Sequence, residues 1–513
     1  MPIDLENWMS FLDPSVRVID TYIPGSHDAS AYLIGDKDTD IKNDAVGSIC
    51  QSGSYTAQCN AGSRYFDMRC RWNDGAVTMH HSDYYFQTFK DVLMQLDKFV
   101  KAHKGEVLFL DIDFDTNDLG LEQEIMNVLI PTLGESRLAT AHVNPSTGEY
   151  NTNLTWGELK QANTPFVVIW RRKGSSLPRW AAYADDMRSD DYDDFNEKSP
   201  EEILAFLTRQ LANWKREKLF LTQLINTPRW SPINPPAEKD YEARDLFNSW
   251  VAGYPPGSNL GIVKMDFVNA AYKRGAINHI VQLNKFTSPP ELPPLTDPIY
   301  YTDKIRLKTA ENQYVCLQVV QHPNLCKLTL VDIPNEDCNF LIRDYDYDPR
   351  KPFPYSGNLD ADTLDCHGNF RMAHLDRRPV NNVGNDYVLS VDTNQGGLIY
   401  WGINWGPSDR NETFCLFDPN WLENDGQVYH GSRVMVLAML HASNNDFAKF
   451  WNAVGNAFVG GVPVAGRGLS KALFNSPSNR RFWMVGQDAE GSKRVYAASP
   501  GTLVAESFVI EKV

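Results

Sequence analysis

Continuous apolar runs recur in the part of the chain before residue 289. They lie at 107–113 (VLFLDID) and 165–170 (PFVVIW), and the segments KLFLTQLI and NLGIVKMDFV follow later. Unbroken apolar runs, rather than alternating ones, are typical of parallel strands that are covered on both faces. We therefore expect these segments to be buried parallel strands.

Helical patterns separate the apolar runs. Segment 91–103 has apolar residues at helical spacing, and segment 199–214 opens with Ser199 followed three residues later by Glu202. Such a pair forms a capping box at a helix start. Strands that alternate with helices over residues 1–288 fit a βα barrel better than a sandwich.

The pattern changes after a proline-rich stretch. The stretch SPPELPPLTDP carries five prolines, and proline interrupts both helices and central strands, so we interpret residues 289–298 as an interdomain linker. Residues 299–513 contain short strands separated by turns rich in Asn, Asp and Gly, which predicts an all-β domain. A recurring unit of a strand, a polar turn and an aromatic-containing strand favours a β-trefoil-like three-fold repeat.

The charge and the hydropathy exclude some classes of partner. The net charge is −16, which disfavours non-specific binding to nucleic acid. No segment approaches the roughly 18 consecutive apolar residues of a transmembrane helix. The start MPIDLENWMS shows no signal peptide, although a mature secreted form would look the same. We suspect secretion, with a cytoplasmic location as the alternative, and no protein partner is implied.

The cysteines leave the redox compartment open. There are eight in the chain, and none forms a CxxC pair with the spacing of a zinc site. Cys50 and Cys59 are near enough in sequence to form a disulfide, as are Cys316, Cys326 and Cys338. The sequence does not determine their connectivity.

Ionisable side chains gather at the predicted strand ends. In a βα barrel, residues just beyond the carboxyl ends of the strands lie at one mouth. The residues at these positions are His27, Asp28, Asp67, Arg69, His80, His81, Asp111, Asp113, Arg171 and Asp266. In YIPGSHDA, residues 22–29, we expect Pro24 and Gly25 to end a strand so that His27 stands at the mouth.

These residue types form a consistent chemical set. Two histidines can serve as general base and general acid near pH 7. Arginine can bind a phosphate through two parallel hydrogen bonds, and nearby carboxylates can orient the imidazoles. The set predicts a phosphodiester site that works by acid–base catalysis.

Three ordered motifs resemble those of the bacterial phosphatidylinositol-specific phospholipases C, an X-domain family. They are IPGSHDA, QCNAGSRYFDMRCRW and VTMHH, and MDF near residue 266 resembles the family's last catalytic strand. The resemblance covers about residues 15–285. It implies a distorted TIM-type (βα) barrel that cleaves phosphatidylinositol, in membranes or micelles, to diacylglycerol and inositol 1,2-cyclic phosphate.

The resemblance also implies roles for single residues. His27 would deprotonate the inositol 2-hydroxyl while Asp266 orients it. Arg69 would stabilise charge on the phosphate. His81, coupled to Asp28, would protonate the departing diacylglycerol oxygen.

Further residues have supporting roles in the same comparison. Asp67 would help to fix Arg69, and Arg171 matches a family arginine that contacts the inositol hydroxyls. Asp193 or Asp194 is a second candidate for that contact. His80 is expected to be structural, because the motif matches its neighbour.

The metal requirement depends on Arg69. Calcium-dependent relatives carry an acidic residue at that place, so Arg69 resembles the metal-free type, and we expect no cofactor. Where metal-free relatives carry a lysine on the fourth strand, this chain has Asp113, with Asp111 nearby. Carboxylate oxygens suit calcium, so a calcium site at Asp111 and Asp113 is the alternative.

Two other functions remain open on the residues alone. The first is a metal-dependent glycerophosphodiester phosphodiesterase, which needs a metal-binding carboxylate cluster. The second is a lipid- or glycan-binding protein without catalysis, which would bind without turnover.

Overall fold

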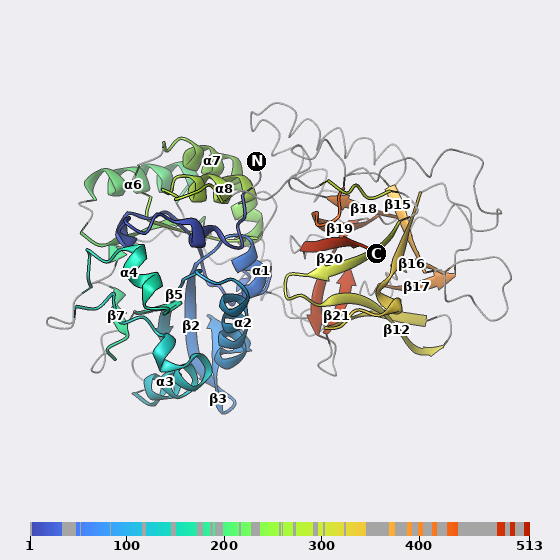
Figure 1. Cartoon of the computed structure of the whole chain (residues 1–513), viewed down its shortest axis with the longest axis horizontal. Coiled ribbons are helices and arrows are strands. Elements are labelled where there is room, and N and C mark those ends of the chain that lie inside the picture. The colour runs from blue at the N-terminus through green and yellow to red at the C-terminus, as the bar shows by residue number, and fades with distance from the viewer. Residues whose placement is uncertain are drawn as a thin grey trace. The chain divides into compact units, whose positions relative to one another are not determined.

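The computed structural model divides the chain into two compact units (Figure 1). The N-terminal unit holds the described residues from 3 to 290, and the C-terminal unit holds those from 296 to 513. The structure describes residues 3–32, 48–344, 369–374, 387–391, 399–403, 413–417, 428–439, 480–487, 493–497 and 507–513, except for gaps at 52, 83, 115–118, 145–149, 172–177, 185–187, 190–197, 215–216, 227–235, 256–257, 259, 270–272, 291–295, 301–302 and 323–324. Residues 291–295 of the predicted linker therefore lie outside the described residues.

A parallel sheet forms the centre of the N-terminal unit. Its strands follow the order β7 (Ala181–Tyr183), β6 (Phe166–Trp170), β5 (Leu108–Phe114), β2 (Tyr65–Asn73), β1 (Ile23–Ser26), β10 (Ile262–Met265), β9 (Leu219–Leu224) and β8 (Arg188–Ser189). All neighbours along this path are parallel. Among the described residues, the outer strands β7 and β8 do not pair. The sheet is thus a TIM-like half-barrel.

Helices cover the outside of this sheet (Figure 1). They are α1 (Tyr55–Asn60), α2 (Phe89–Ala102), α3 (Leu119–Leu133), α4 (Trp156–Gln161), α6 (Pro200–Asn213), α7 (Pro236–Ala252) and α8 (Arg274–Gln282), with short 3-10 helices at Trp8–Phe11, Val18–Asp20 and Glu135–Arg137. None of the helices in the described part of the chain has the length and apolar character of a membrane span. The capping box predicted at the start of α6 is confirmed, because Ser199 and Glu202 cap each other's backbone.

The apolar side chains on the two faces of each central strand pack into different cores. In β5, Leu108, Leu110 and Ile112 pack with α2 and α3 in an outer core, whereas Phe109 belongs to the core on the other face. Side chains of a strand alternate between the faces. Asp111, two residues after Phe109, therefore points with it into the half-barrel.

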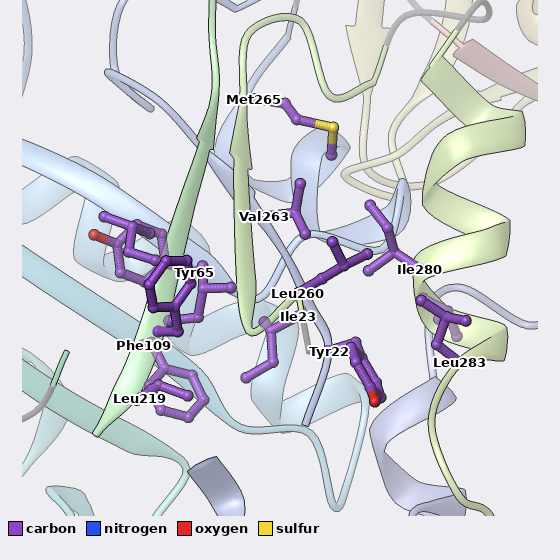
Figure 2. Packing of buried hydrophobic residues seen from close by; sticks show 14 of the residues in the cluster. Tyr22, Ile23, Tyr65, Phe109, Leu219, Leu260, Val263, Met265, Ile280 and Leu283 are labelled. Atoms are coloured by element: carbon purple, nitrogen blue, oxygen red, sulfur yellow. The ribbon is translucent and has the colours of Figure 1, made fainter. Parts of the chain in front are cut away.

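The inner core closes one end of the half-barrel. Figure 2 shows Tyr65, Phe109 and Leu219 in this core, whereas Val263 of β10 points to the outer face of the sheet, toward Ile280 of α8. All of these side chains are fully buried. Burial of a side chain of this size stabilises the fold by roughly 1.5–3 kcal/mol, so the inner core gives the strand ends a rigid base.

Two predictions about strand ends are wrong. The first concerns Pro24 and Gly25, which lie inside β1 instead of ending a strand. Parallel pairing with β10 sets this register, since Ile23 opposes Ile262 and Ser26 opposes Met265. Gly25 is required there, because a Cβ would lie 2.9 Å from the Tyr65 ring.

The second error concerns the barrel strand that contains Asp67. Asp67 and Arg69 lie within β2 and not at its end, and β3 (Ala76–His81) pairs with it antiparallel. β4 (Tyr84–Thr88) extends this hairpin. His81 thus comes from the end of an antiparallel strand and not from a parallel barrel strand.

The C-terminal unit is all-β, with a closed ring of six antiparallel strands. The ring order is β11 (Lys304–Thr309), β14 (Phe340–Asp344), β15 (Asn369–His374), β18 (Thr413–Phe417), β19 (Arg433–Met439) and β22 (Ser507–Lys512), which returns to β11. Closure removes the exposed sheet edges. The buried side chains Leu307, Val436 and Phe508 come from three of these strands.

Three hairpins accompany the ring in the described part of the C-terminal unit. They pair β12 (Tyr314–His322) with β13 (Leu325–Val331), β16 (Tyr387–Val391) with β17 (Ile399–Ile403), and β20 (Arg480–Gln487) with β21 (Lys493–Ala497). One hairpin follows every second ring strand, so the same four-strand unit occurs three times along the chain. A 3-10 helix at Glu336–Cys338 precedes β14.

The cysteines described by the structure are free thiols. They are Cys50, Cys59, Cys70, Cys316 and Cys338, and all are buried. The disulfide that the sequence left open between Cys50 and Cys59 is therefore not formed.

Gly261 provides a test of the close contact between β9 and β10. Its φ is +62°, and a Cβ would lie 2.3 Å from the Phe220 carbonyl oxygen. Gly75 also has a positive φ, of +80°, but nothing within 4 Å of that position. We expect Gly261→Ala to lower the free energy of unfolding by at least about 3 kcal/mol and Gly75→Ala by about 1 kcal/mol, because only the first adds a clash to the left-handed strain.

The measurement is urea unfolding of the full chain, with hydrogen exchange of β10 peptides to identify the transition of the N-terminal unit. Equal losses in the two variants would contradict the packing described for Gly261.

Candidate active site

The same alternation that places Asp111 inside the half-barrel brings a row of charged residues together. In β2, Tyr65 belongs to the inner core, so Asp67 and Arg69 follow it on the inner face. In β5, Asp111 and Asp113 take the same positions, and the register places Asp67 opposite Asp111 and Arg69 opposite Asp113.

β6 and β10 add the remaining charges. Ile169 belongs to the inner core, so Arg171, two residues later, points inward. Lys264 on β10 is buried and also points inward, toward Asp67. Asp266 follows directly after β10.

Asp67 is the buried centre of this charge network. Its carboxylate accepts from Arg171 Nη2 at 2.6 Å and from Lys264 Nζ at 3.2 Å, and Arg69 Nη2 lies 3.5 Å away. Burial alone would raise the pKa of Asp67, but Arg171, Lys264 and Arg69 hold it well below the ordinary value. Asp67 is therefore ionised and holds three cationic side chains from three strands.

Arg171 joins Asp67 to the two aspartates of β5. It donates to Asp111 Oδ2 at 2.8 Å and to Asp113 Oδ2 at 3.3 Å. Burial would lower the pKa of Arg171, but Asp111 and Asp67 keep it well above the usual value. The guanidinium lies between the carboxylates that a calcium ion would need, so Asp111 and Asp113 do not fit the alternative calcium site.

His27 and Asp266 form the tightest pair at the mouth. His27 Nδ1 lies 2.7 Å from Asp266 Oδ1, and only 12% of the His27 side chain is exposed. A carboxylate accepts a hydrogen bond and cannot donate one when ionised, so Nδ1 carries the proton and Nε2 has a free lone pair in the neutral ring. Arg69 Nη2 lies 3.3 Å from that Nε2.

Asp28 lies between the two histidines. Its Oδ2 is 3.4 Å from both His27 Nε2 and His81 Nε2, and its Oδ1 is 2.5 Å from Arg69 Nε. The contact with Arg69 is an ion pair whose angles do not meet hydrogen-bond geometry. Burial would raise the pKa of Asp28, but Arg69, His81 and His27 lower it overall, so Asp28 carries charge.

His81 is oriented by a backbone carbonyl. Its Nδ1 lies 2.8 Å from Ser48 O, which fixes the proton on that nitrogen and turns Nε2 toward Asp28. His80 points elsewhere, with its Nδ1 3.2 Å from Ser82 O, and burial lowers its pKa. The expectation that His81 and not His80 belongs to the cluster agrees with this geometry.

The structure thus brings together most of the residues singled out in the sequence. His27, Asp28, Asp67, Arg69, His81, Arg171 and Asp266 form one connected cluster, and Asp111 and Asp113 join it through Arg171. Asp193 and Asp194 lie outside the described residues.

Sequence reasoning missed two residues of the cluster. Lys264 lies in the apolar run NLGIVKMDFV. A lysine in a buried strand is rare unless it is paired, so its position could have marked it as part of a charge network. Gln51 is fully buried and donates to His27 O at 2.7 Å and to Met265 O at 3.2 Å. Its Oε1 accepts from Val268 N at 3.1 Å. No local sequence pattern marks a glutamine that joins the ends of β1 and β10.

Comparisons with known proteins give relatives that match about half of the chain. The chain is 23% identical to a zebrafish (Danio rerio) PI-PLC X domain-containing protein 3, over 51% of this chain and 88% of that protein. It is 22% identical to the human (Homo sapiens) PI-PLC X domain-containing protein 3, over 55% of this chain and 94% of that protein. No protein-family model matches the chain.

Solved structures similar to the chain include two bacterial enzymes. A phosphatidylinositol-specific phospholipase C from Listeria monocytogenes is 19% identical, covers 55% of this chain and all of its own, and has a TM-score of 0.46. One from Staphylococcus aureus is 18% identical, covers 56% of this chain and 98% of its own, and has a TM-score of 0.43.

The charge of Asp67 has a consequence for acid stability. A carboxyl group whose folded pKa is depressed adds stability above its unfolded pKa, and that stability is lost as the pH falls toward the folded pKa. The unfolded pKa of aspartate is about 3.9. We expect Asp67→Asn to lower the free energy of unfolding by about 3–5 kcal/mol at pH 7, because three cations lose their buried partner. Below about pH 4 the variant should lose less further stability than the wild type.

Asp97→Asn is the matched control, since Asp97 pairs with Lys101 and Arg137 nearer the surface. Its cost should stay below about 1 kcal/mol. Urea unfolding at pH 7 and pH 3, with hydrogen exchange of β2 peptides, measures both effects. If Asp67→Asn costs no more than Asp97→Asn, the central role of Asp67 is wrong.

Proposed function

Since the chain belongs to an X-domain PI-PLC-like family, we propose that it is a phosphatidylinositol-specific phospholipase C, a phosphatidylinositol diacylglycerol-lyase. The observation that carries the proposal is the pair of oriented imidazoles on either side of Asp28, with Arg69 beside His27. The substrate is phosphatidylinositol at a membrane or micelle surface, and the products are diacylglycerol and inositol 1,2-cyclic phosphate.

The first step is attack by the inositol 2-hydroxyl. His27 takes the hydroxyl proton on Nε2, the lone pair that its 2.7 Å contact with Asp266 leaves free. The 2-oxygen then forms a bond to phosphorus. Asp266 stabilises the imidazolium that results.

The second part of the reaction is departure of diacylglycerol. The bond between phosphorus and the diacylglycerol oxygen breaks, and His81 gives its Nε2 proton to that oxygen. Asp28, 3.4 Å from this nitrogen, stabilises the protonated ring beforehand. Arg69 neutralises charge on the phosphate oxygens.

Arg171 and Asp113 are proposed to line the inositol site, with the buried Asp111 holding Arg171 in place. They offer donors and acceptors in one cluster, 18% of the Arg171 and of the Asp113 side chain being exposed. Asp193 and Asp194 stay candidates for the same contact. No step of this mechanism needs a metal ion, because Arg69 supplies the positive charge.

We also propose that the C-terminal unit is a β-trefoil. The six-strand ring and the three hairpins, one in each four-strand unit, support this assignment. An experimental structure in which β22 pairs with a strand other than β11 and β19 would contradict it.

The direct test of the enzyme proposal is phosphorus NMR of phosphatidylinositol in detergent micelles with the full chain and excess chelator. We expect the resonance of a cyclic inositol phosphate. Turnover that requires added calcium would overturn the metal-free mechanism. No turnover by folded protein, either with chelator or with added calcium, would favour a binding protein.

The roles of the histidines are tested by single substitutions. We expect His27→Ala and His81→Ala to lower kcat by at least about a hundredfold, because each loses one proton-transfer group. His80→Ala is the matched control and should retain wild-type turnover, since His80 contacts Ser82 and not the cluster. Wild-type activity in either of the first two variants, measured by diacylglycerol release, would remove that histidine from the mechanism.

Gln51 is proposed as a positioning residue. Gln51→Ala leaves His27 O and Val268 N without their partner, so the His27–Asp266 contact should loosen. We expect kcat to fall at least about tenfold, with KM little changed, because the substrate contacts remain while the base is misplaced.

Asn284→Ala is its matched control. Asn284 is a buried amide that bonds to the backbone of Tyr22 just before β1, at the opposite end of that strand from His27. Both substitutions should lower stability, but only Gln51→Ala should lower kcat. A fall in kcat that follows stability equally in both variants would reduce Gln51 to a structural role.

A further inference from the structure

Cys50 lies where the two histidine–aspartate pairs meet. Its Sγ is 3.7 Å from His81 Nδ1 and 3.9 Å from Asp28 Oδ2. One ligand atom each from Asp28, Cys50 and His81 lies within 4.8 Å of the other two. The proposed reaction uses the histidines and aspartates but not this thiol.

We propose that Asp28, Cys50 and His81 form a binding site for a thiophilic divalent cation of the Zn²⁺ type, and that binding of the cation switches catalysis off. Thiolate, imidazole and carboxylate are the ligands that Zn²⁺ takes in proteins. The site is inhibitory because the ion takes groups that the reaction needs.

Two of the three distances between the ligand atoms are close to those of a tetrahedral site, and Cys50 Sγ lies within 4.8 Å of a ring nitrogen of His81. Zn²⁺ bond lengths correspond to tetrahedron edges of about 3.4 Å between nitrogen and oxygen and about 3.6 Å between sulfur and oxygen. Here His81 Nε2 and Asp28 Oδ2 are 3.4 Å apart, and Cys50 Sγ and Asp28 Oδ2 are 3.9 Å apart. Movement of Cys50 Sγ toward His81 Nε2 would complete the three-ligand set and leave the fourth position for water.

His81 is already oriented as a metal ligand. The 2.8 Å contact of its Nδ1 with Ser48 O holds the proton on that nitrogen, so the Nε2 lone pair is directed toward Asp28. A second ring nitrogen bonded to a backbone carbonyl is the usual arrangement around metal-bound histidine. The side chain is 19% exposed, which gives the ion a route from solvent to the buried thiol.

Negative charges near Cys50 offset the repulsion between Arg69 and a bound cation. The guanidinium Nε contacts Asp28 Oδ1 and leaves Oδ2 for the ion. A carboxylate oxygen of Asp266 lies within 4.8 Å of Cys50 Sγ. The ion would therefore lie near two carboxylates and a thiolate against one guanidinium.

The binding step is balanced by release of two protons from the catalytic form. Zn²⁺ replaces the thiol proton of Cys50 and the Nε2 proton of His81, both of which pass to the buffer, and takes the Nε2 lone pair that is left. His81 then has no proton on Nε2 to give to the diacylglycerol oxygen. This loss of turnover rests on the proposed function, whereas binding of the ion does not.

Binding is measured first, without substrate. The full chain is stripped with chelator and titrated with Co²⁺, which occupies zinc sites and gives a thiolate-to-metal absorption band. We expect one Co²⁺ per chain, a thiolate band and tetrahedral visible bands, and displacement by Zn²⁺. Absence of a thiolate band would overturn the site, whatever the catalytic activity is.

Two matched controls identify the ligands. Cys50→Ala should abolish the band and raise the Zn²⁺ Kd at least about tenfold, whereas Cys59→Ala should change neither, because Cys59 is equally buried but lies outside the cluster. His81→Gln should weaken binding in the same way, while His80→Gln should not. If Cys50→Ala binds Zn²⁺ as tightly as the wild type, the proposal is wrong.

Inhibition is then measured as turnover of each variant relative to its own rate without metal. We expect Zn²⁺ to inhibit the wild type and Cys59→Ala at equal concentration, and to inhibit Cys50→Ala only at a concentration at least about tenfold higher. Binding without inhibition would overturn the switch. If the protein shows no turnover at all, the proposed function fails while the absorption band still decides the metal site.

Discussion

The buried carboxylate of Asp67 is the interaction on which the rest of the site depends. It joins cations from β2, β6 and β10, namely Arg69, Arg171 and Lys264. Removing such a carboxylate from water is costly, and only close opposite charges offset the cost. The three strand ends are thus held in one arrangement, and that arrangement brings His27, Asp28 and His81 within reach of one another.

The geometry of the two histidines follows from their partners. Asp266 orients the ring of His27, and Ser48 O orients that of His81, so both Nε2 atoms face the same oxygen of Asp28. A phosphodiester between them would meet a base on one side and an acid on the other, with Arg69 at the phosphate. The same convergence explains why a thiophilic ion at Cys50 would compete with catalysis.

Local pattern predicted much of the fold and of the site. The capping box of α6 and the continuous apolar runs depend on neighbouring residues, so they were readable in the sequence. The alternation in Asp67–Arg69 and Asp111–Asp113 places four charges on the inner face once the strands are known. His27, His81 and Asp266 come from distant segments, and ordered motifs were needed to link them.

The errors come from interactions that no local pattern encodes. Pro24 and Gly25 lie within β1 because pairing with β10 and contact with Tyr65 outweigh the preference of proline and glycine for turns. Gln51 bonds to backbone groups more than 20 positions away in the chain on one side and more than 200 on the other, so its role depends on tertiary structure alone.

The central claim, attack by the substrate's own 2-hydroxyl, is tested most directly with phosphatidylinositol methylated at that oxygen. The account predicts that the full chain cleaves the parent lipid and leaves the methylated lipid intact, whereas release of diacylglycerol from the methylated lipid would contradict it.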